Sequence, residues 1–394
     1  MKVPASARTG RTGLLEIFLI YLRLGCLSFG GPVAHIGYFK TTFVTQLQWL
    51  SETRFAELMA LSQAVPGPSS SQLGFAIGWV RGGGLGALVA WLGFTLPSAC
   101  LMIAAAYGLI AMGEAAAPIL DGLRVAAAAV VAHAVITLGK HLCPDRSRIS
   151  LALASAGAAI LWPSGLTQLG LICCGAIIGY ARYRSQPGTA ASPSTALSID
   201  GRGTRPALLA FAGLMLLALT MTPEMPGALY AMHYQAGALV FGGGHVVLPL
   251  LQDTVVGSGL VAERDFLAGY GAAQALPGPL FTFAAFTGTI ATQHWLGGLV
   301  TLCALFLPGL LLITALLPCW DRFRNQLWAQ AGLKGANAVV VGLLLAALLT
   351  LVGPHSFQHW ADGLLVAGAY IALTRFNWSA AWVVLACGTL GTFL

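Results

Sequence analysis

Charged residues are scarce in this chain. Only 8% of its 394 residues are Asp, Glu, Lys or Arg, and 57% are hydrophobic, whereas an ordinary soluble domain is about 25% charged. So few charges cannot cover a surface in contact with water, which excludes the soluble classes. A transmembrane helix needs about 20 mostly apolar residues, and many runs in the chain reach that length. We therefore predict an all-α integral membrane protein with the lipid bilayer as its solvent.

Several chemical signatures are also missing. The eight cysteines form no CxxC pair, so neither a disulfide framework nor a zinc site is indicated. No GxxxxGK[ST] loop offers a site for ATP. No cluster of His, Asp and Glu has metal-ligand spacing, and no nucleophile lies beside a recognisable base. We expect no cofactor, no metal and no enzymatic activity.

The net charge of +7 does not require a nucleic-acid partner. The basic residues gather in short loops such as 140–148 and in the segment 182–205, as the positive-inside rule predicts for cytoplasmic loops. Residues 1–13 are polar and basic, so we place this N-terminus in the cytoplasm. The first apolar run carries two charges and lacks a small-residue cleavage site, which argues against a removable signal peptide.

The chain contains an internal duplication. Residues 63–68, Gln-Ala-Val-Pro-Gly-Pro, return 211 positions later as Gln-Ala-Leu-Pro-Gly-Pro at 274–279, and Phe29-Gly-Gly-Pro returns 212 positions later as Phe241-Gly-Gly-Gly. The polar, Ser- and Gly-rich segment between the halves reads as a flexible linker. The predicted organisation is a first transmembrane repeat at 14–181, a cytoplasmic linker at 182–205, and a second transmembrane repeat at 206–394.

The second repeat begins with one extra apolar run, residues 206–222. If each Pro-Gly-Pro segment crosses the membrane once, the chain has about 13 crossings; it has fewer if these segments are re-entrant hairpins. The odd extra helix inverts the second repeat relative to the first and places the C-terminus in the periplasm. Loop charges fit this count except around Lys40 and Arg54, which fall outside. Inverted repeats with discontinuous helices near the midplane are typical of secondary transporters.

The helix breaks are the predicted functional centre. Proline removes a backbone donor, and lipid cannot satisfy the freed backbone groups, so the breaks must face protein or a water-filled cavity. A half-helix that starts after a break presents unpaired N–H groups and positive dipole character, which suits an anion. The predicted break residues are Pro32, Pro66, Gly67, Pro68, Pro277, Gly278 and Pro279; the polar residues that follow them are Ser69, Ser70, Ser71, Gln72 and, in the less polar second half, Thr282.

Arg23 is the most conspicuous charge inside an apolar run. A charge at mid-membrane costs about 2.5–3.5 kcal/mol on insertion scales, and its planar fork suits a tetrahedral oxyanion. It could instead pair with an internal acid such as Glu57 or snorkel to the interface. Glu57 is itself a candidate for proton coupling. Asp121 and Arg124 are spaced to pair with each other.

Other candidate ligands flank the breaks, and each has a structural alternative. Glycine N–H groups could bind substrate or permit close helix packing. A histidine could titrate near neutral pH or cap a helix, and the amides could contact substrate or brace freed carbonyls. These candidates are Gly30, Gly31, Gln63, Gly242, Gly243, Gly244, His245 and Gln274.

The motifs Phe29-Gly-Gly-Pro, Gln63–Pro68, and Phe241-Gly-Gly-Gly-His with its later Gln-Ala-Leu-Pro-Gly-Pro resemble those of the chromate ion transporter family in its long, two-domain form. The resemblance spans about residues 14–394. It implies efflux of chromate from the bacterial cytoplasm across the inner membrane, chromate resistance, and a secondary carrier. Sulfate, a tetrahedral dianion of similar size, is expected to compete.

The resulting hypothesis is a secondary active oxyanion exporter that works by alternating access around the half-helix N-termini and Arg23. A passive anion channel on the same scaffold, and a carrier of sulfate or another oxyanion, stay open as alternatives. We expect Arg23→Ala, and separately Ser69→Ala with Ser70→Ala, to abolish chromate efflux, and Arg23→Lys to restore it partly. Helices rich in small residues allow a homodimer without demanding one.

Overall fold

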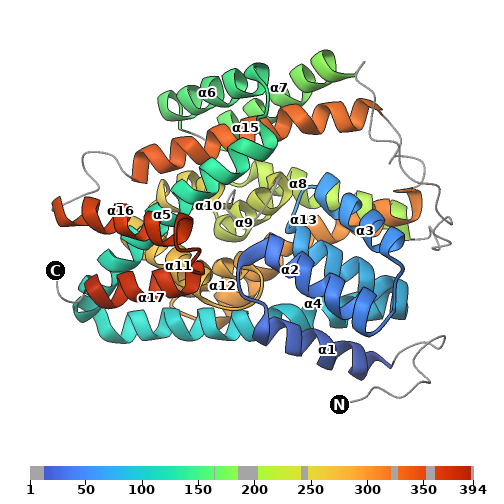
Figure 1. The fold of residues 1–394 in the computed structure, drawn as a ribbon, viewed down its shortest axis with the longest axis horizontal. Coiled ribbons are helices and arrows are strands. Elements are labelled where there is room, and N and C mark those ends of the chain that lie inside the picture. The colour runs from blue at the N-terminus through green and yellow to red at the C-terminus, as the bar shows by residue number, and fades with distance from the viewer. Residues whose placement is uncertain are drawn as a thin grey trace.

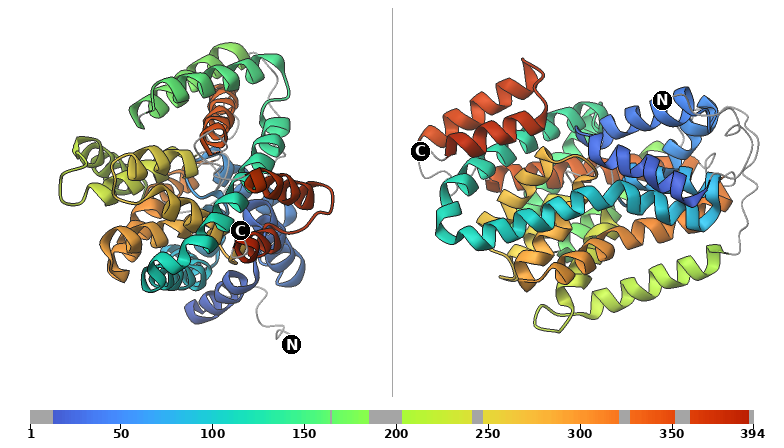
Figure 2. Two further views of the ribbon diagram at one scale, coloured as in Figure 1. Left: turned by 90° about the vertical axis from the view of Figure 1, so that its left-hand side faces the viewer. Right: turned by 90° about the horizontal axis from the view of Figure 1, so that it is seen from below.

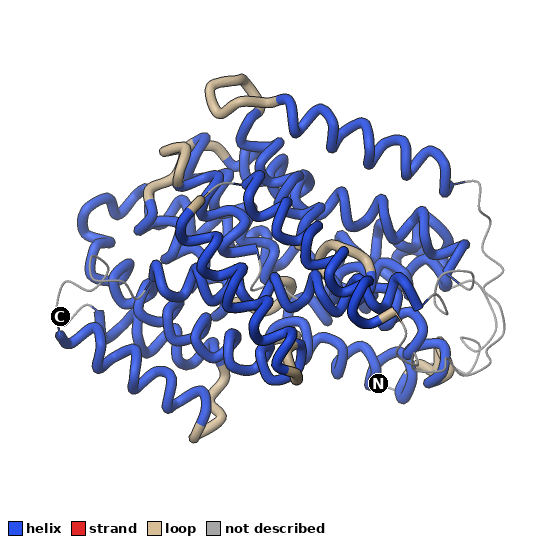
Figure 3. The backbone as a smooth tube through the Cα atoms, turned by 90° about the horizontal axis from the view of Figure 1, so that it is seen from above, coloured by secondary structure: helices blue, strands red, loops and turns tan. Residues whose placement is uncertain are grey.

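The computed structural model describes residues 13–163, 165–184, 203–240, 247–320, 327–351 and 360–391. Helices and their connections make up this part of the chain, and no strand occurs in it (Figure 3). Most helices run along the long axis of the molecule (Figure 1). The all-helical, two-repeat architecture expected from the sequence is confirmed.

The helices of the first repeat are α1 (Leu14–Leu27), α2 (Gly31–Phe39), the π-helix η2 (Lys40–Gln46), α3 (Glu52–Ala64), α4 (Ser69–Met112), the 3-10 turn η3 (Gly113–Ala116), α5 (Ala117–Leu142), α6 (Arg146–Leu161) and α7 (Gly165–Tyr183). The extra helix α8 (Thr204–Thr220) lies along the outer edge of the bundle (Figure 2). The second repeat then contains α9 (Ala228–Leu239), α10 (Val247–Leu251), the π-helix η6 (Gln252–Val256), α11 (Glu263–Ala275), η7 (Leu280–Thr282), α12 (Phe283–Thr292), α13 (Trp295–Leu316), η8 (Leu317–Cys319), α15 (Leu327–Leu351), α16 (Trp360–Thr374) and α17 (Ala380–Gly391).

Helix α4 is a hairpin of two arms. It leaves helical geometry at Gly82 and Gly83, and Gly83 has a positive φ of 66°. A Cβ on Gly78 would lie 2.6 Å from the carbonyl oxygen of Gly86, although residues eight apart in a straight helix are about 12 Å apart along its axis. The chain therefore turns back on itself at the two glycines.

The second repeat has the same reversal between α12 and α13. The turn residue Gln293 has a positive φ of 55°. A Cβ on Gly288 would lie 2.6 Å from the carbonyl oxygen of Gly297, so α12 and α13 are packed as tightly as the two arms of α4.

The first Pro-Gly-Pro segment returns to the end of the bundle from which it came. The guanidinium of Arg81, at the end of the first arm of α4, lies 5.1 Å from the ring of Trp49, just before α3 begins. Trp49 also stacks on Phe43 of η2, and a Cβ on Gly82 would approach Leu14 at the start of α1. The starts of α1 and α3 therefore lie at the same end of the bundle as the Gly82–Gly83 turn of α4.

The second repeat enters from the opposite end. Trp295, at the start of α13, donates its backbone N–H to the hydroxyl of Tyr107 at 2.9 Å, near the far end of α4. Arg264, at the start of α11, binds Asp121 at the start of α5. The two repeats thus run in opposite directions through the bundle.

The Arg264–Asp121 contact also corrects an expectation from spacing. Arg264 donates to the two carboxylate oxygens of Asp121 at 3.1 and 2.7 Å, and to the carbonyl of Ala117. The predicted Asp121–Arg124 pair is therefore wrong: the partner of Asp121 comes from the other repeat, 143 positions away, which helical spacing cannot reveal.

Three segments are long and apolar enough to cross a membrane: Ser69–Leu142, Trp295–Cys319 and Gln330–Thr350. The first includes the reversal at Gly82–Gly83 and the turn η3, so it is not a single straight span. Large apolar side chains are exposed on the outer helices, among them Leu209 and Leu216 of α8. Together with the composition, these features mark an integral membrane protein.

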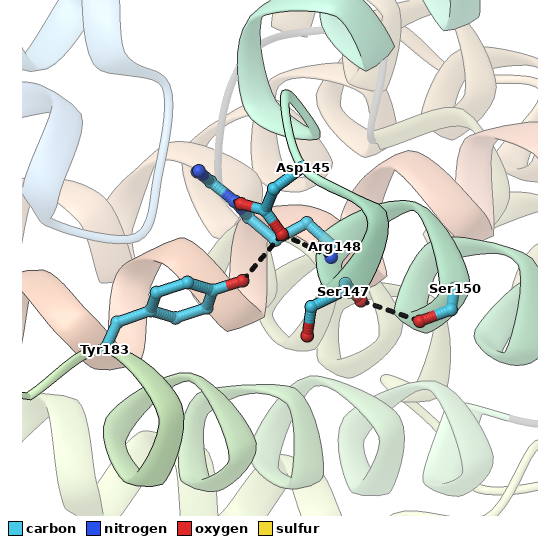
Figure 4. A network of polar contacts seen from close by, with 5 residues as sticks. All are labelled: Asp145, Ser147, Arg148, Ser150 and Tyr183. Atoms are coloured by element: carbon cyan, nitrogen blue, oxygen red, sulfur yellow. Dashed lines mark hydrogen bonds and ion pairs between the residues drawn. The ribbon is translucent and has the colours of Figure 1, made fainter.

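A polar network joins the α5–α6 loop to the end of α7 (Figure 4). The carboxylate of Asp145 caps α6 by accepting the Arg148 N–H at 3.0 Å, and it pairs with the Arg148 side chain at 2.6 Å. The hydroxyl of Tyr183 donates to Asp145 at 2.8 Å. Burial raises the pKa of Asp145, but these hydrogen bonds outweigh it and lower the pKa to about 2.

We expect Asp145→Ala to lower the thermal stability of the purified protein at pH 7, because loss of a helix cap costs about 0.5–2 kcal/mol. The folded-state pKa of Asp145 lies below its unfolded value of about 3.9. Its contribution is therefore complete above about pH 4 and is lost as the pH falls toward 2. Melting curves from pH 7 to pH 2 should show the variant approaching the wild type. Ser150→Ala, which removes an exposed hydroxyl bonded to Ser147, is the control; a constant difference at every pH would contradict the assignment.

Candidate substrate site

Each Pro-Gly-Pro break contacts the end of the first helix of the other repeat. Gly67 donates its backbone N–H to the carbonyl of Val240, just after α9, at 2.7 Å. Gly278 donates to the carbonyl of Ser28, just after α1, at 2.8 Å. Ser28 and Val240 are 212 positions apart, the spacing of the repeat. These two bonds are counterparts, and they join the interrupted helices at the centre of the molecule.

The breaks also lie against the middle of the long helices. A Cβ on Gly67 would be 2.8 Å from the Cα of Gly309 in α13, and one on Gly278 would be 3.0 Å from Ser98 in α4. Ser98 and Gly309 are again repeat counterparts. Gly67 and Gly278 have φ of 129° and 91°, values that favour glycine. Both breaks therefore require glycine for conformation and for space.

A buried histidine connects the elements of the first repeat. The Nε2 of His35 in α2 lies 3.2 Å from the carbonyl of Ser28, and its Nδ1 lies 3.3 Å from the hydroxyl of Ser70. A carbonyl only accepts, so Nε2 donates, and in the neutral ring Nδ1 accepts from Ser70. We call Ser28, His35, Gly67, Ser70 and Gly278 the central junction.

Unpaired polar atoms surround the central junction. Seven buried side-chain polar atoms have no hydrogen-bond partner within the described part of the chain. Three of them are the hydroxyls of Ser28, Ser71 and Thr95, the last one turn before Ser98 on α4. A fourth is the amide oxygen of Gln72, which can only accept a hydrogen bond. An unsatisfied buried polar group costs about 1–3 kcal/mol. Such a concentration at one place indicates a site that a polar ligand completes.

Backbone donors point to the same ligand chemistry. The first arm of α4 starts at Ser69 after Pro68, which makes no side-chain cap, so its first N–H groups have no partner within the helix. Helix α2 starts after Gly30, whose φ of 98° is left-handed. Both half-helices direct the positive end of their dipole toward the central junction, which favours an anion.

The structure places the sequence-predicted residues unequally. Ser70, Ser71 and Gln72 are buried beside the first break, and the Gln72 amide donates to the carbonyls of Pro66 and Gly309 at 2.8 and 3.1 Å. Thr282 is buried beside the second break, where Ser98 donates to it at 2.6 Å. Gln274 is partly buried and Gln63 is exposed. Gly242, Gly243, Gly244 and His245 lie outside the described residues, as does the side chain of Pro32.

Arg23 does not lie with these groups. It is exposed on a face of α1 that it shares with Leu15, Leu19 and Leu27, which are 52–70% exposed. Glu57 is paired with Arg54 at 3.0 Å near the start of α3. The alternative partner considered for Arg23 is therefore engaged elsewhere, and the roles of Arg23 in binding and Glu57 in proton coupling stay predictions.

Sequence reasoning missed Ser28, His35, Thr95 and Ser98. His35 follows the Gly-Gly-Pro break by one helical turn, so a histidine placed just after a break was the available signal. The sequence carried no signal that pointed to Thr95 or Ser98, because isolated hydroxyl residues are common in membrane helices. No group of three or more His, Cys, Asp or Glu in the described chain could hold a metal ion.

Two inverted repeats of interrupted helices, joined through a buried polar junction in an apolar bundle, define a membrane transport protein. The chain belongs to the chromate transporter family: the sequence profile of the family described as "Chromate transporter" matches residues 15–180 and 227–392. Both repeats are thus members of one family.

Individual relatives agree with that membership. The chain is 29% identical to a chromate transport protein of Pseudomonas aeruginosa over 85% of this chain and 80% of that protein. It is 28% identical to a probable chromate transport protein of Synechococcus elongatus over 86% and 84%. It is 25% identical to a chromate transport protein of Cupriavidus metallidurans over 86% and 82%. No solved structure matches the chain.

Proposed function

We propose that this protein is a secondary active transporter that exports chromate from the cytoplasm across the bacterial inner membrane and so confers chromate resistance. The observation that carries the proposal is the set of unpaired, buried hydroxyl groups of Ser28, Ser71 and Thr95 beside the helix breaks. Membership in the chromate transporter family supplies the substrate class.

The chemistry of the junction suits a tetrahedral dianion. Chromate presents four oxygens, and hydroxyl groups and the free N–H groups at the start of α4 can donate to several of them at once. No cation is needed in the site if these neutral donors surround the anion, since their dipoles are fixed by the fold. Sulfate has the same shape and charge, so we propose that it competes.

We further propose that the chain crosses the membrane nine times. The crossing elements are the second arm of α4 with α5, α6, α7, α8, α13, α15, α16 and α17, while the α1–α2, α3–α4, α9–α10 and α11–α12 pairs re-enter. Lys40, Arg54 and Arg81 then share the basic, cytoplasmic end with the start of α1. Lys40 and Arg54, which the 13-crossing count placed outside, then obey the positive-inside rule. Nine is also an odd number of crossings, so the C-terminus remains periplasmic.

Export is tested by comparing cells with and without the gene. We expect cells that carry it to accumulate less chromate and to lose this advantage when a protonophore collapses the membrane potential and proton gradient. Equal accumulation would contradict export. If chromate equilibrates across the membrane whether or not the gradient is present, the protein is a passive channel. If the gene protects cells only against another oxyanion, that oxyanion and not chromate is the substrate.

In the same cells, Arg23→Ala decides between two readings of that residue. The sequence predicts that this variant loses export, but the exposure of Arg23 among leucines of α1 leads us to propose the opposite, that the variant retains low chromate accumulation. Loss of export, with the protein still present in the membrane, would restore Arg23 to the substrate site.

A further inference from the structure

The repeat counterparts α3 and α11 are packed differently. Helix α11 packs along α5 and α17, and its residues Phe266 to Gly271 are buried. Within the described chain, α3 has no comparable packing against α15 and α7, the counterparts of α5 and α17. The same helix is therefore enclosed in one repeat and open in the other.

The open side of α3 is the side that α11 buries. The exposed residues of α3 include Thr53, Ala56, Ala60 and Gln63, and their counterparts 211 positions later are Arg264, Leu267, Gly271 and Gln274. A Cβ on Gly271 would lie 2.7 Å from the carbonyl oxygen of Leu123 in α5, and Leu267 is 2% exposed. One helix face is thus closed on a neighbour in the second repeat and uncovered in the first.

This face of α3 does not have the chemistry of a lipid contact. It consists of threonine, alanine and glutamine and leads from the start of α3 to the first break, whereas the outward faces of α1 and α8 carry leucines such as Leu19 and Leu209. Exposing the Gln63 amide to lipid would leave it unsatisfied at a cost of several kcal/mol. Water on this face would satisfy the Gln63 amide and would extend along α3 as far as the residues just before the first break.

In the second repeat, an ion pair joins α11 to α5. The Nε and Nη2 groups of Arg264 donate to the two carboxylate oxygens of Asp121, and Nη2 also donates to the carbonyl of Ala117. Aligning Gly122-Leu123-Arg124 of α5 with Gly332-Leu333-Lys334 of α15 makes Ala331 the counterpart of Asp121, and Thr53 is the counterpart of Arg264. Thr53 and Ala331 cannot form an ion pair, so only the α11–α5 side has this latch.

We propose that α3 and α11 are the two gates of the transporter and that the Arg264–Asp121 ion pair holds the α11 gate shut in this conformation, which is open to the end where α3 begins. In the opposite conformation α3 closes on α15, and α11 separates from α5 as the ion pair breaks. This inference rests on the proposed alternating-access transport. It assigns the gating role to residues outside the substrate site.

Ala60→Leu tests the closing of α3. The side chain has room in the present conformation because Ala60 is exposed, so folding should be unaffected, but the leucine would prevent close approach to α15. We expect chromate transport to fall about tenfold or more with unchanged protein in the membrane. The control is Ala212→Leu, an exposed alanine among the leucines of α8. Equal, undiminished transport by both variants would overturn the proposal. The exposed face of α3 would then be covered by lipid or by a second copy of the chain and would not close on α15.

The latch is tested by a measurement that does not need chromate. In a full-length variant without the eight native cysteines, Ala60→Cys should react with a membrane-impermeant maleimide applied from the α3 end. The Arg264 and Asp121 side chains are 40% and 48% exposed, and an ion pair in contact with water shifts an equilibrium only modestly. Adding Asp121→Asn should therefore lower the labelling rate about two- to fivefold by releasing the α11 gate, and the charge exchange Asp121→Arg with Arg264→Asp should restore it. Labelling unaffected by Asp121→Asn would overturn the latch. A change in labelling without any chromate flux would leave the gates in place and refute only the proposed substrate.

Discussion

Gly67→Ala is expected to abolish transport and to destabilise the protein strongly. The added methyl would lie 2.7 Å from the Gln72 amide nitrogen and 2.8 Å from the Cα of Gly309, at a φ of 129°. Overpacking costs about 1–3 kcal/mol, and the backbone conformation adds about 1–3 kcal/mol of strain for a residue with a Cβ. Relief of either would move the Gly67–Val240 hydrogen bond that joins the repeats.

The matched control for this variant is Gly213→Ala in α8, where a Cβ would meet nothing within 4 Å. Alanine is favoured over glycine in a helix by about 1 kcal/mol, so this variant should match or exceed the wild type in melting temperature and transport. Gly278→Ala should behave like Gly67→Ala, since Gly278 has a φ of 91° and close contacts to Ser98. Wild-type transport by Gly67→Ala would contradict the role of the break.

Ser71→Ala is expected to reduce chromate flux strongly without lowering the stability of the protein. The hydroxyl of Ser71 is buried and has no hydrogen-bond partner among the described residues. Replacing such a group by alanine removes an unsatisfied polar atom, so Ser71→Ala should keep or raise the melting temperature. If the hydroxyl binds the substrate, the same variant should lose about tenfold or more in chromate flux, since a lost hydrogen bond to a charged group is worth about 1.5–3 kcal/mol.

Ser62→Ala separates this effect from a general loss of hydroxyls. Ser62 is 1% exposed, and its hydroxyl donates to the carbonyl of Met59 within α3. Its removal should leave the flux unchanged. Parallel loss of stability and flux in Ser71→Ala would mean that Ser71 supports the fold and does not bind the anion.

The sequence predicted the features that depend on composition and repetition. The low charge predicted a membrane protein, and the repeated Pro-Gly-Pro motif predicted two repeats with breaks at corresponding places. Ser70 and Ser71 were correctly expected next to the first break, because their position follows directly from the chain.

The sequence alone could not predict features that depend on which way a helix face points in the fold. The charge of Arg23 suggested an internal site, but only the packing of α1 on α4 determines that Arg23 lies outward with Leu19. The partner of Asp121 is 143 positions away. Whether a broken segment crosses or returns depends on contacts such as Arg81 on Trp49, and hydropathy is the same in both cases.

The central claim is that the protein carries chromate through a site beside the helix breaks, and uptake of chromate into energised everted membrane vesicles tests it most directly. We predict uptake by the wild type, progressive inhibition by added sulfate, and uptake reduced about tenfold or more in Ser71→Ala vesicles containing the same amount of protein. Absence of chromate uptake by energised wild-type vesicles would contradict the proposed transport, and undiminished uptake by Ser71→Ala would contradict the site.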